Sequence, residues 1–304
     1  GHNIIGYDVP VLERLLGTDF SSCKITDTLV LSRLTDPSRE GGHSLDSWGQ
    51  SLGFPKGEHS DWDTFSQDMV DYCKQDVLVN VKVYNALRSV LAGFGSESIS
   101  LEHQVQSIIT KQTDNGWLLD QEHAFILLAK LKEKKYDLED KVHETFKPLP
   151  TFIKEITPKY KKDGTMSVVG LKFLGDQWEN YTAPFSRIDY PAFNLGSRQQ
   201  IARYLQYFGW KPEKFTEKGQ AIVDESVLSK VTGIPEANMI AEYLMVQKRI
   251  AQIQSWLDAV ADDGRVHGYV NANGAVTGRM THSSPNLAQV PSSSAPYGTE
   301  CRAC

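Results

Sequence analysis

The sequence lacks a long apolar run, a dense set of cysteines and an excess of positive charge. No stretch approaches the ~18–20 consecutive apolar residues that span a membrane, and no signal peptide is visible, so we expect no membrane partner. The four cysteines, at positions 23, 73, 301 and 304, are too scattered for a disulfide framework and suit a reducing cytoplasm. The net charge of −6 excludes nucleic-acid binding through bulk positive charge, but not through a local basic groove.

The composition favours a folded chain. Its 304 residues are 40% hydrophobic and 10% aromatic, which is enough for about two domains with buried cores. Residue 1 is glycine and opens an apolar segment, and residues 301–304 read as the approach to a strand. Neither end has the polar character of a natural terminus. We therefore expect a fragment of a longer protein.

Helical periodicity organises the first 93 residues. Pro10 lies in the first turn of a short predicted helix over 9–16. Apolar residues spaced by three and four between Met69 and Leu87 predict a long helix over 66–90 with one buried face. A glycine-rich break follows at 93–96.

The remaining residues alternate between predicted helices and short strands. Asn115 and Gly116 predict a turn, residues 117–119 a strand, and Asp120 the N-cap of a helix over 121–146. Prolines and lysines mark residues 148–193, where apolar runs such as 167–169 predict a small β-rich insertion. Further helices are expected over 99–111, 197–208 and 235–260, and a hairpin is expected to pair 265–271 with 275–280.

Two acidic patterns in the first 93 residues suggest phosphodiester hydrolysis. Tyr72 and Asp76 are one helical turn apart on one face, and the N-x-x-x-Y-D pattern from Asn3 ends at Asp8. Two-metal hydrolysis needs several carboxylates around hard cations such as Mg²⁺, and a tyrosine beside a metal-binding aspartate can orient the attacking water. The Y-x-x-x-D spacing alone is also common for a surface aspartate and a half-buried tyrosine, but the upstream pattern favours the functional interpretation.

The most specific pattern spans residues 277–291, T-G-R-M-T-H-S-S-P-N-L-A-Q-V-P. It resembles the T-G-R and P-N-L-x-x-h-P segment of family A (DNA polymerase I-like) DNA polymerases, in particular the podovirus-type bacteriophage replicative group. In that family the segment lies against the primer–template minor groove. Every base pair offers acceptors there, so a guanidinium reads pairing geometry rather than sequence.

The resemblance implies an α/β fold and a set of roles. Residues 1–93 would be a truncated ribonuclease H-like 3′–5′ exonuclease unit. Residues 94–304 would be the N-terminal part of a polymerase domain, with a mainly helical thumb over 121–260, an insertion at 148–193, and the first palm strands over 265–304. Asp8 and Asp76 would bind Mg²⁺ and Tyr72 would position water. The proposed DNA contacts are Arg279, Asn286 and Gln289 in the minor groove, and Lys248 and Arg249 on phosphates, although an exposed basic pair without a role is an equal alternative for the last two.

The resemblance also implies partners and gaps. The parent enzyme would use primer–template DNA and dNTPs in the cytoplasm of a bacterial host. The family's first nuclease motif would precede this chain and the palm aspartates would follow Cys304, so we expect the chain alone to be inactive at both two-metal sites. The insertion would either clamp DNA or dock a thioredoxin-like processivity factor. A zinc or redox site at Cys301-x-x-Cys304 is disfavoured because no second ligand pair exists.

Two alternatives to the replicative polymerase with proofreading remain. A DNA-binding or processivity module derived from a polymerase thumb would keep the DNA-gripping residues without chemistry. A stand-alone tyrosine-type 3′–5′ exonuclease would have no use for residues 277–291.

Overall fold

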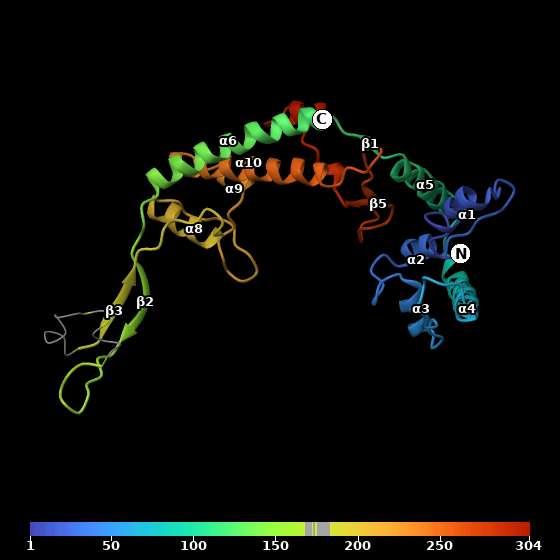
Figure 1. The fold of residues 1–304 in the computed structure, drawn as a ribbon, viewed down its shortest axis with the longest axis horizontal. Helices are drawn as coiled ribbons and strands as arrows, with labels where there is room; N and C mark the ends of the chain where they lie inside the picture. The colour runs from blue at the N-terminus through green and yellow to red at the C-terminus, as the bar shows by residue number, and fades with distance from the viewer. Residues whose placement is uncertain (168–171, 173, 175–182) are drawn as a thin grey trace. The chain divides into compact units, whose positions relative to one another are not determined.

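The computed structural model describes residues 1–167, 172, 174 and 183–304. The chain divides into two compact units, residues 1–124 with 254–304, and residues 125–253. Helices predominate in both units (Figure 1), and the described strands form three two-stranded antiparallel sheets. The fold class is therefore α/β with a large helical share. None of the described helices has the length and apolar character needed to cross a bilayer.

Five helices begin the first unit. They are α1 (Asp8–Leu16), α2 (Thr28–Thr35), α3 (Leu45–Ser51), α4 (Gln67–Leu91) and α5 (Ser96–Asn115).

Helix α4 confirms the long helix predicted around 66–90. The Ser66 hydroxyl caps it by accepting a hydrogen bond from the Met69 N–H at 3.2 Å. Val79 and Leu87 are buried against Leu31 of α2. Further toward the N-terminus the predicted apolar face is exposed at Val77, so only the second half of α4 packs in the core.

Two segments that are distant in sequence, residues 116–118 and 265–267, meet after α5. Gly116 has φ +62°, and a Cβ there would lie 2.8 Å from the His267 ring, so the turn requires glycine. Strand β1 (Trp117–Leu118) pairs with β4 (Arg265–Val266). The predicted Asp120 cap is confirmed, because its carboxylate accepts the His123 N–H at 3.0 Å at the start of α6 (Gln121–Thr145).

The predicted hairpin is only partly correct, because residues 265–271 form two short strands, β4 and β5, of which only β5 enters the hairpin. Strand β5 (Tyr269–Asn271) pairs with β6 (Thr281–Ser283), not with residues 275–280. Those residues form a turn in which the Gly278 N–H donates to the Ala275 carbonyl at 2.9 Å and φ of Gly278 is +73°. A left-handed residue ends extended pairing, so the T-G-R motif lies in a connection and not on a strand.

The end of the chain also differs from the prediction. Residues 301–304 were expected on a strand, but α11 (Gly298–Ala303) is a helix after the 3₁₀ turn η2 (Leu287–Gln289). A Cβ at Gly298 would fall 1.8 Å from the Ser292 carbonyl oxygen, so the helix starts where only glycine fits. Its remaining residues include good helix formers.

The second unit joins long helices to a β-ribbon. Strands β2 (Thr151–Ile156) and β3 (Phe185–Asp189) pair with a register shift between Phe152 and Lys154, which confirms the β structure predicted for the segment 148–193. Of the apolar run predicted at 167–169, positions 168 and 169 lie outside the described residues. Three helices follow: α8 (Arg198–Tyr207), α9 (Glu225–Leu228) and α10 (Pro235–Leu257).

Helices α6 and α10 lie side by side in this unit (Figure 1), with Lys134 paired to Glu242 at 2.9 Å. The Tyr243 hydroxyl donates to Glu139 at 3.1 Å. Burial and the Glu139 carboxylate raise the pKa of Tyr243 to about 12, so the phenol keeps its proton at neutral pH. These contacts give the helix pair a fixed register.

Candidate nucleic-acid interface

Arg279 lies at the end of the turn that connects β5 to β6. Its carbonyl accepts the Ala275 N–H at 3.1 Å, which closes the turn. The side chain is exposed, as are Val276 at 72% and Met280 at 47%. The backbone is thus fixed while the guanidinium extends into solvent, an arrangement that suits a donor for an external ligand.

Two neighbours in the predicted hairpin turn position this loop, through contacts that were not predicted. Asn273 donates from Nδ2 to the Glu102 carboxylate of α5 at 2.9 Å. A Cβ at Gly274 would meet the Thr281 hydroxyl at 1.8 Å. The Asn-Gly pair at 273–274 was a visible turn signal, but its contact with Glu102 joins residues 171 positions apart.

Asn286 and Gln289 lie at the two ends of η2. The Asn286 side-chain oxygen accepts the Ala288 N–H at 3.1 Å, so it acts as the N-cap of this turn. Its amide nitrogen therefore carries the donors that remain for a ligand. Gln289 is exposed, and β6 connects this turn to the Arg279 loop.

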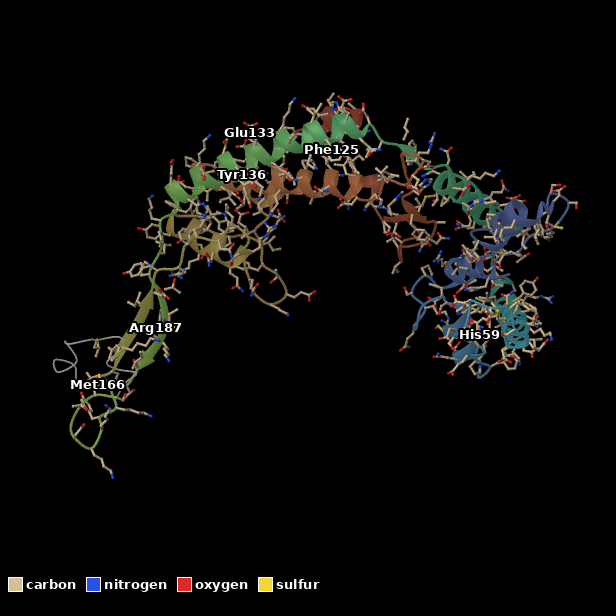
Figure 2. The ribbon with its side chains drawn as sticks, viewed as in Figure 1. His59, Phe125, Glu133, Tyr136, Met166 and Arg187 are labelled. Carbon is tan, nitrogen blue, oxygen red and sulfur yellow. The ribbon has the colours of Figure 1, made fainter. Side chains whose placement is uncertain are left out.

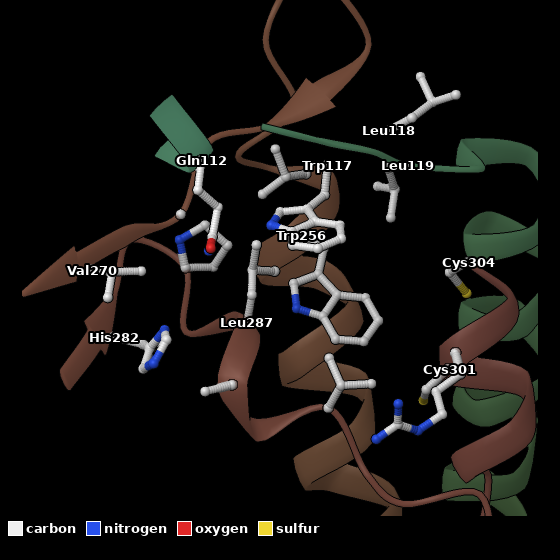
Figure 3. Close-up of a pocket in the computed structure, with 16 residues that line it drawn as sticks. Gln112, Trp117, Leu118, Leu119, Trp256, Val270, His282, Leu287, Cys301 and Cys304 are labelled. Carbon is white, nitrogen blue, oxygen red and sulfur yellow. The ribbon is translucent and has the colours of Figure 1, made fainter. Parts of the chain in front are cut away.

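A mainly apolar cavity of about 510 Å³ lies beneath this segment (Figure 3), lined by Trp117, Trp256, Leu287 and Cys301 among others. His282 is half-buried at its wall.

Cys301 and Cys304 line the C-terminal end of this cavity. Burial, then the neighbouring Cys301, raises the pKa of the Cys304 thiol to about 11. At neutral pH such a thiol keeps its proton and is a weak nucleophile. The described residues also contain no group of three or more histidines, cysteines, aspartates or glutamates that could hold a metal.

Lys248 and Arg249, the basic pair on α10, differ in burial. Lys248 is exposed, whereas Arg249 is only 7% exposed and its guanidinium lies 3.5 Å from the Gln252 side-chain oxygen. The expectation of an exposed basic pair is therefore wrong for Arg249, because this part of α10 is buried on that side. Lys248 alone offers an exposed cation for phosphate.

Tyr72 and Asp76 project from α4, and both contact the side chain of Lys56. The Lys56 ammonium lies 2.9 Å from Asp76 Oδ2 and 5.1 Å from the centroid of the Tyr72 ring. The other carboxylate oxygen, Asp76 Oδ1, is buried without a hydrogen-bond partner in the described chain. Lys56 was missed because nothing in the sequence links it to a residue 20 positions away.

Asp8 makes no contact of this kind with Tyr72 or Asp76 in the described structure. It is exposed in the first turn of α1, and among the described residues no hydrogen bond or ion pair joins it to Tyr72 or Asp76. The unpaired oxygen of Asp76 suits a hard cation. In the part of the chain that the structure describes, however, no group of three possible metal ligands surrounds it. These residues do not by themselves fit a Mg²⁺ pair.

Asp27 organises the segment before Asp8 and was also missed. It is 1% exposed. Its carboxylate accepts backbone N–H groups of Asn3 at 2.8 Å, Ile5 at 3.1 Å and Leu29 at 2.9 Å. A buried carboxylate needs such donors, so Asp27 fixes the turn that leads to Asp8.

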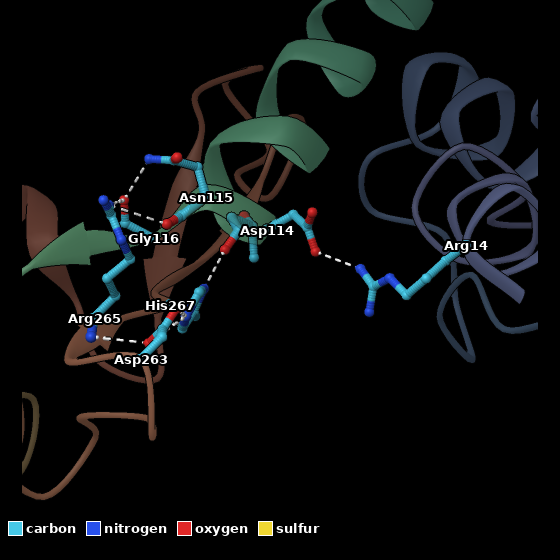
Figure 4. A network of polar contacts seen from close by, with 8 residues as sticks. Arg14, Asp114, Asn115, Gly116, Asp263, Arg265 and His267 are labelled. Atoms are coloured by element: carbon cyan, nitrogen blue, oxygen red, sulfur yellow. Dashed lines mark hydrogen bonds and ion pairs between the residues drawn. The ribbon is translucent and has the colours of Figure 1, made fainter.

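The C-terminal end of α5 is held by contacts from two directions (Figure 4). Arg14 of α1 pairs with Asp114 at 2.8 Å. His267 Nδ1 lies 2.8 Å from the Thr113 carbonyl and Nε2 lies 3.2 Å from Asp263. The bond to the Thr113 carbonyl and the Asp263 carboxylate raise the pKa of His267. The helix end is thereby joined to both α1 and the β4 segment.

Comparison with known proteins supports one family. A model of "DNA polymerase family A" matches residues 172–304. The DNA-directed DNA polymerases of Escherichia phage T7 and Enterobacteria phage T3 are each 34% identical over 397 aligned residues, covering 99% of this chain and 56% of each phage protein. The chain thus spans about half the length of these curated relatives.

A solved structure has a similar fold. It is the polymerase domain of Pol1 from M. smegmatis, in complex with DNA primer–template and dNTP. Its TM-score is 0.63 at 19% identity, over 91% of this chain and 40% of that one, and at such identity the likeness concerns the fold. The family model over residues 172–304 and the two phage relatives, which align with nearly the whole sequence, agree with each other: the chain is similar to DNA polymerases of family A.

Proposed function

We propose that this chain is part of a replicative DNA-directed DNA polymerase with 3′–5′ proofreading, which extends primers on a DNA template with dNTPs. The relatives from phages T7 and T3, named as DNA-directed DNA polymerases, support the polymerase activity. The observation that carries the proposal is the exposed guanidinium of Arg279 on a turn closed by its own backbone.

The proposed domains follow the motifs. Residues 1–93 form part of an exonuclease unit, residues 121–260 a thumb with the insertion at 148–193, and residues 265–304 the beginning of a palm. The paired helices α6 and α10 support a thumb assignment, because a register fixed by several polar contacts suits a rigid arm beside a duplex.

Each proposed DNA contact has a distinct physical task. Arg279 donates to purine N3 or pyrimidine O2 in the minor groove, which every correctly paired step presents. Asn286 donates from the amide nitrogen that its cap leaves outward, and Gln289 adds a second amide. Lys248 contributes charge to a phosphate, which adds affinity without sequence preference.

Divalent metal ions are the general cofactors of this family and would stabilise charge at both proposed sites. Asp8 and Asp76 are the proposed ligands in the nuclease unit. Because the described residues do not complete a metal site, the roles assigned to this chain are binding and orientation. Tyr72, one turn from Asp76, would orient water at the nuclease site.

The proposal is tested by duplex binding. We expect the 304-residue chain to bind a primed DNA duplex, measured by fluorescence anisotropy, and Arg279→Ala to weaken binding about tenfold, because a hydrogen bond from a charged group contributes ~1.5–3 kcal/mol. Arg88→Ala, at an exposed arginine of α4, is the matched control and should bind as the wild type does. Equal affinity of the two variants would contradict the proposed role of Arg279.

A further inference from the structure

We propose that the apolar cavity beneath β6 and η2 is a binding site for a flat, uncharged heteroaromatic molecule that carries one hydrogen-bond acceptor. The acceptor bonds to the indole N–H of Trp256, which lines the cavity. The inference concerns a place to which the sequence motifs assign nothing. It does not rest on the proposed polymerase or exonuclease roles.

The cavity has the size and the walls of a small-molecule site. Its volume of about 510 Å³ lies within the ~300–1,000 Å³ that is usual for such sites. A cavity of ~150 Å³ is enough for benzene, so this one can hold two fused rings. Val266 and Leu287 provide apolar walls, and Trp117 is 59% exposed, so its ring is accessible to an entering molecule. These walls favour a flat apolar body.

A polar atom on one of the lining side chains is unpaired. Trp256 of α10 is only 3% exposed, and among the described residues its Nε1 has no hydrogen-bond partner. Its indole lies among the side chains that line the cavity (Figure 3). A buried donor without an acceptor is unfavourable. The half-buried Trp48, by contrast, donates from Nε1 to the Ser32 hydroxyl at 2.8 Å. An acceptor on a bound molecule gives Trp256 the partner that the described chain does not supply.

The lining favours a neutral molecule over a charged one. None of the described lining residues is acidic, and the permanent charge among them belongs to Arg302. Its Nε donates to the Pro291 carbonyl at 2.8 Å, which holds the guanidinium in place. A cation buried here has no carboxylate to pair with, and an anion loses its hydration against apolar walls with one exposed arginine to compensate. A neutral ring nitrogen or carbonyl is therefore the acceptor that fits.

Quinoline and naphthalene are a matched pair of probes, because they share a two-ring shape and only quinoline has an acceptor nitrogen. Each is titrated into the ¹⁵N-labelled 304-residue chain, and the indole N–H resonances of its six tryptophans are followed by NMR. Tryptophan-to-phenylalanine variants at single positions assign the resonances, the last one by elimination. We expect quinoline to shift the Trp256 resonance in a saturable manner. The Trp48 resonance should not shift, because its N–H is already bonded to Ser32.

Trp256→Phe removes the donor and keeps an aromatic ring. We expect it to lower the affinity for quinoline about fivefold more than the affinity for naphthalene, because only quinoline loses a hydrogen bond. Trp117, which also lines the cavity, reports binding in this variant. Ala288→Phe places a large ring at an exposed position of the lining and should weaken the binding of both probes. As a control, Tyr136→Ser removes an exposed ring of α6, labelled in Figure 2, and should change neither affinity.

Two results overturn the proposal. If quinoline at millimolar concentration shifts neither the Trp256 nor the Trp117 resonance, the cavity takes no such molecule. If Trp256→Phe weakens both probes equally, the acceptor is not recognised. Should circular dichroism show that this variant is unfolded, the wild type decides. The ring currents of the two probes are similar, so equal shifts of the Trp256 indole proton exclude the hydrogen bond, whereas a larger downfield shift with quinoline supports it.

Discussion

At the scale of single residues, space around the backbone decides where the proposed DNA contacts lie. Gly274 is close to Thr281 and Gly278 has a left-handed backbone, and together they return the chain directly after Arg279. Neither the close approach at Gly274 nor the backbone conformation of Gly278 can be predicted from the hydrophobic periodicity of the sequence. Recognition of the T-G-R motif was sufficient to select Arg279, but not to predict that it lies on a turn.

Gly274→Ala should test this placement. The added methyl would fall 1.8 Å from the Thr281 hydroxyl, so the loop or β6 must move, at a cost of ~1–3 kcal/mol in unfolding free energy. We expect a lower midpoint in urea denaturation and weaker duplex binding. Gly93→Ala, where the nearest atom is 3.9 Å away, is the control. Unchanged duplex affinity of Gly274→Ala would show that the turn does not position Arg279.

Three supporting contacts could not be predicted, because each joins residues that are far apart in the sequence. Asp27 with Asn3, Lys56 with Asp76, and Asn273 with Glu102 are pairs that only the folded chain creates. Charge and periodicity also could not show that Arg249 is buried while its neighbour Lys248 is exposed. The sequence therefore supplied the candidate residues, whereas their supporting contacts required the structure.

At the scale of elements, long amphipathic segments were predictable. Helices α4, α6, α8 and α10 lie where spacing, caps and glycine breaks place them, since many residues contribute to each pattern. Prediction failed for two short elements, the three-residue strand β6 and the six-residue helix α11, because they have too few positions to show a period. Their conformations are set by neighbouring contacts instead.

The junction between α5 and β4 should respond to pH. The folded pKa of His267 lies above its ordinary value of 6.5, so the native state binds the proton more tightly than the unfolded chain. The stabilising contribution is complete below 6.5 and is lost as the pH rises through the folded pKa. We expect a small loss of thermal stability across that window.

His267→Gln is the variant that isolates this term. Its melting temperature relative to the wild type should be lowest at acidic pH and converge with it at alkaline pH, in differential scanning calorimetry. His143→Gln, another histidine near a backbone carbonyl, serves as the comparison. A constant difference at every pH would show that protonation of His267 contributes nothing to folding.

At the scale of the whole molecule, the sequence motifs do not decide which partner the proposed insertion at 148–193 binds. Its ribbon exposes Phe152, Ile188 and Tyr190. Lys154 lies opposite Arg187 across the strands, and like charges in that position are unfavourable for a two-stranded sheet. Exposed apolar and cationic side chains on this two-stranded ribbon support the proposal that residues 148–193 bind a protein or DNA partner.

Titration calorimetry with reduced thioredoxin distinguishes these partners. If the insertion docks a thioredoxin-like factor, a heat of binding should appear on mixing. Phe152→Ser should then reduce affinity by roughly thirtyfold, because a buried aromatic anchor contributes ~2 kcal/mol or more at an interface. Phe215→Ser, at an exposed phenylalanine outside the insertion, should have no effect. Absence of heat with thioredoxin would remove that partner and favour the DNA clamp.

The two ends of the Asn286 amide have different roles at the N-cap of η2. The oxygen of Asn286 is committed to the Ala288 N–H, so folding itself decides which end of the amide faces outward. A carboxylate of the same shape would preserve this turn yet present an acceptor toward acceptors in the groove. At this position, therefore, the local fold and the proposed recognition of a base pair can be separated by exchanging a single nitrogen for oxygen.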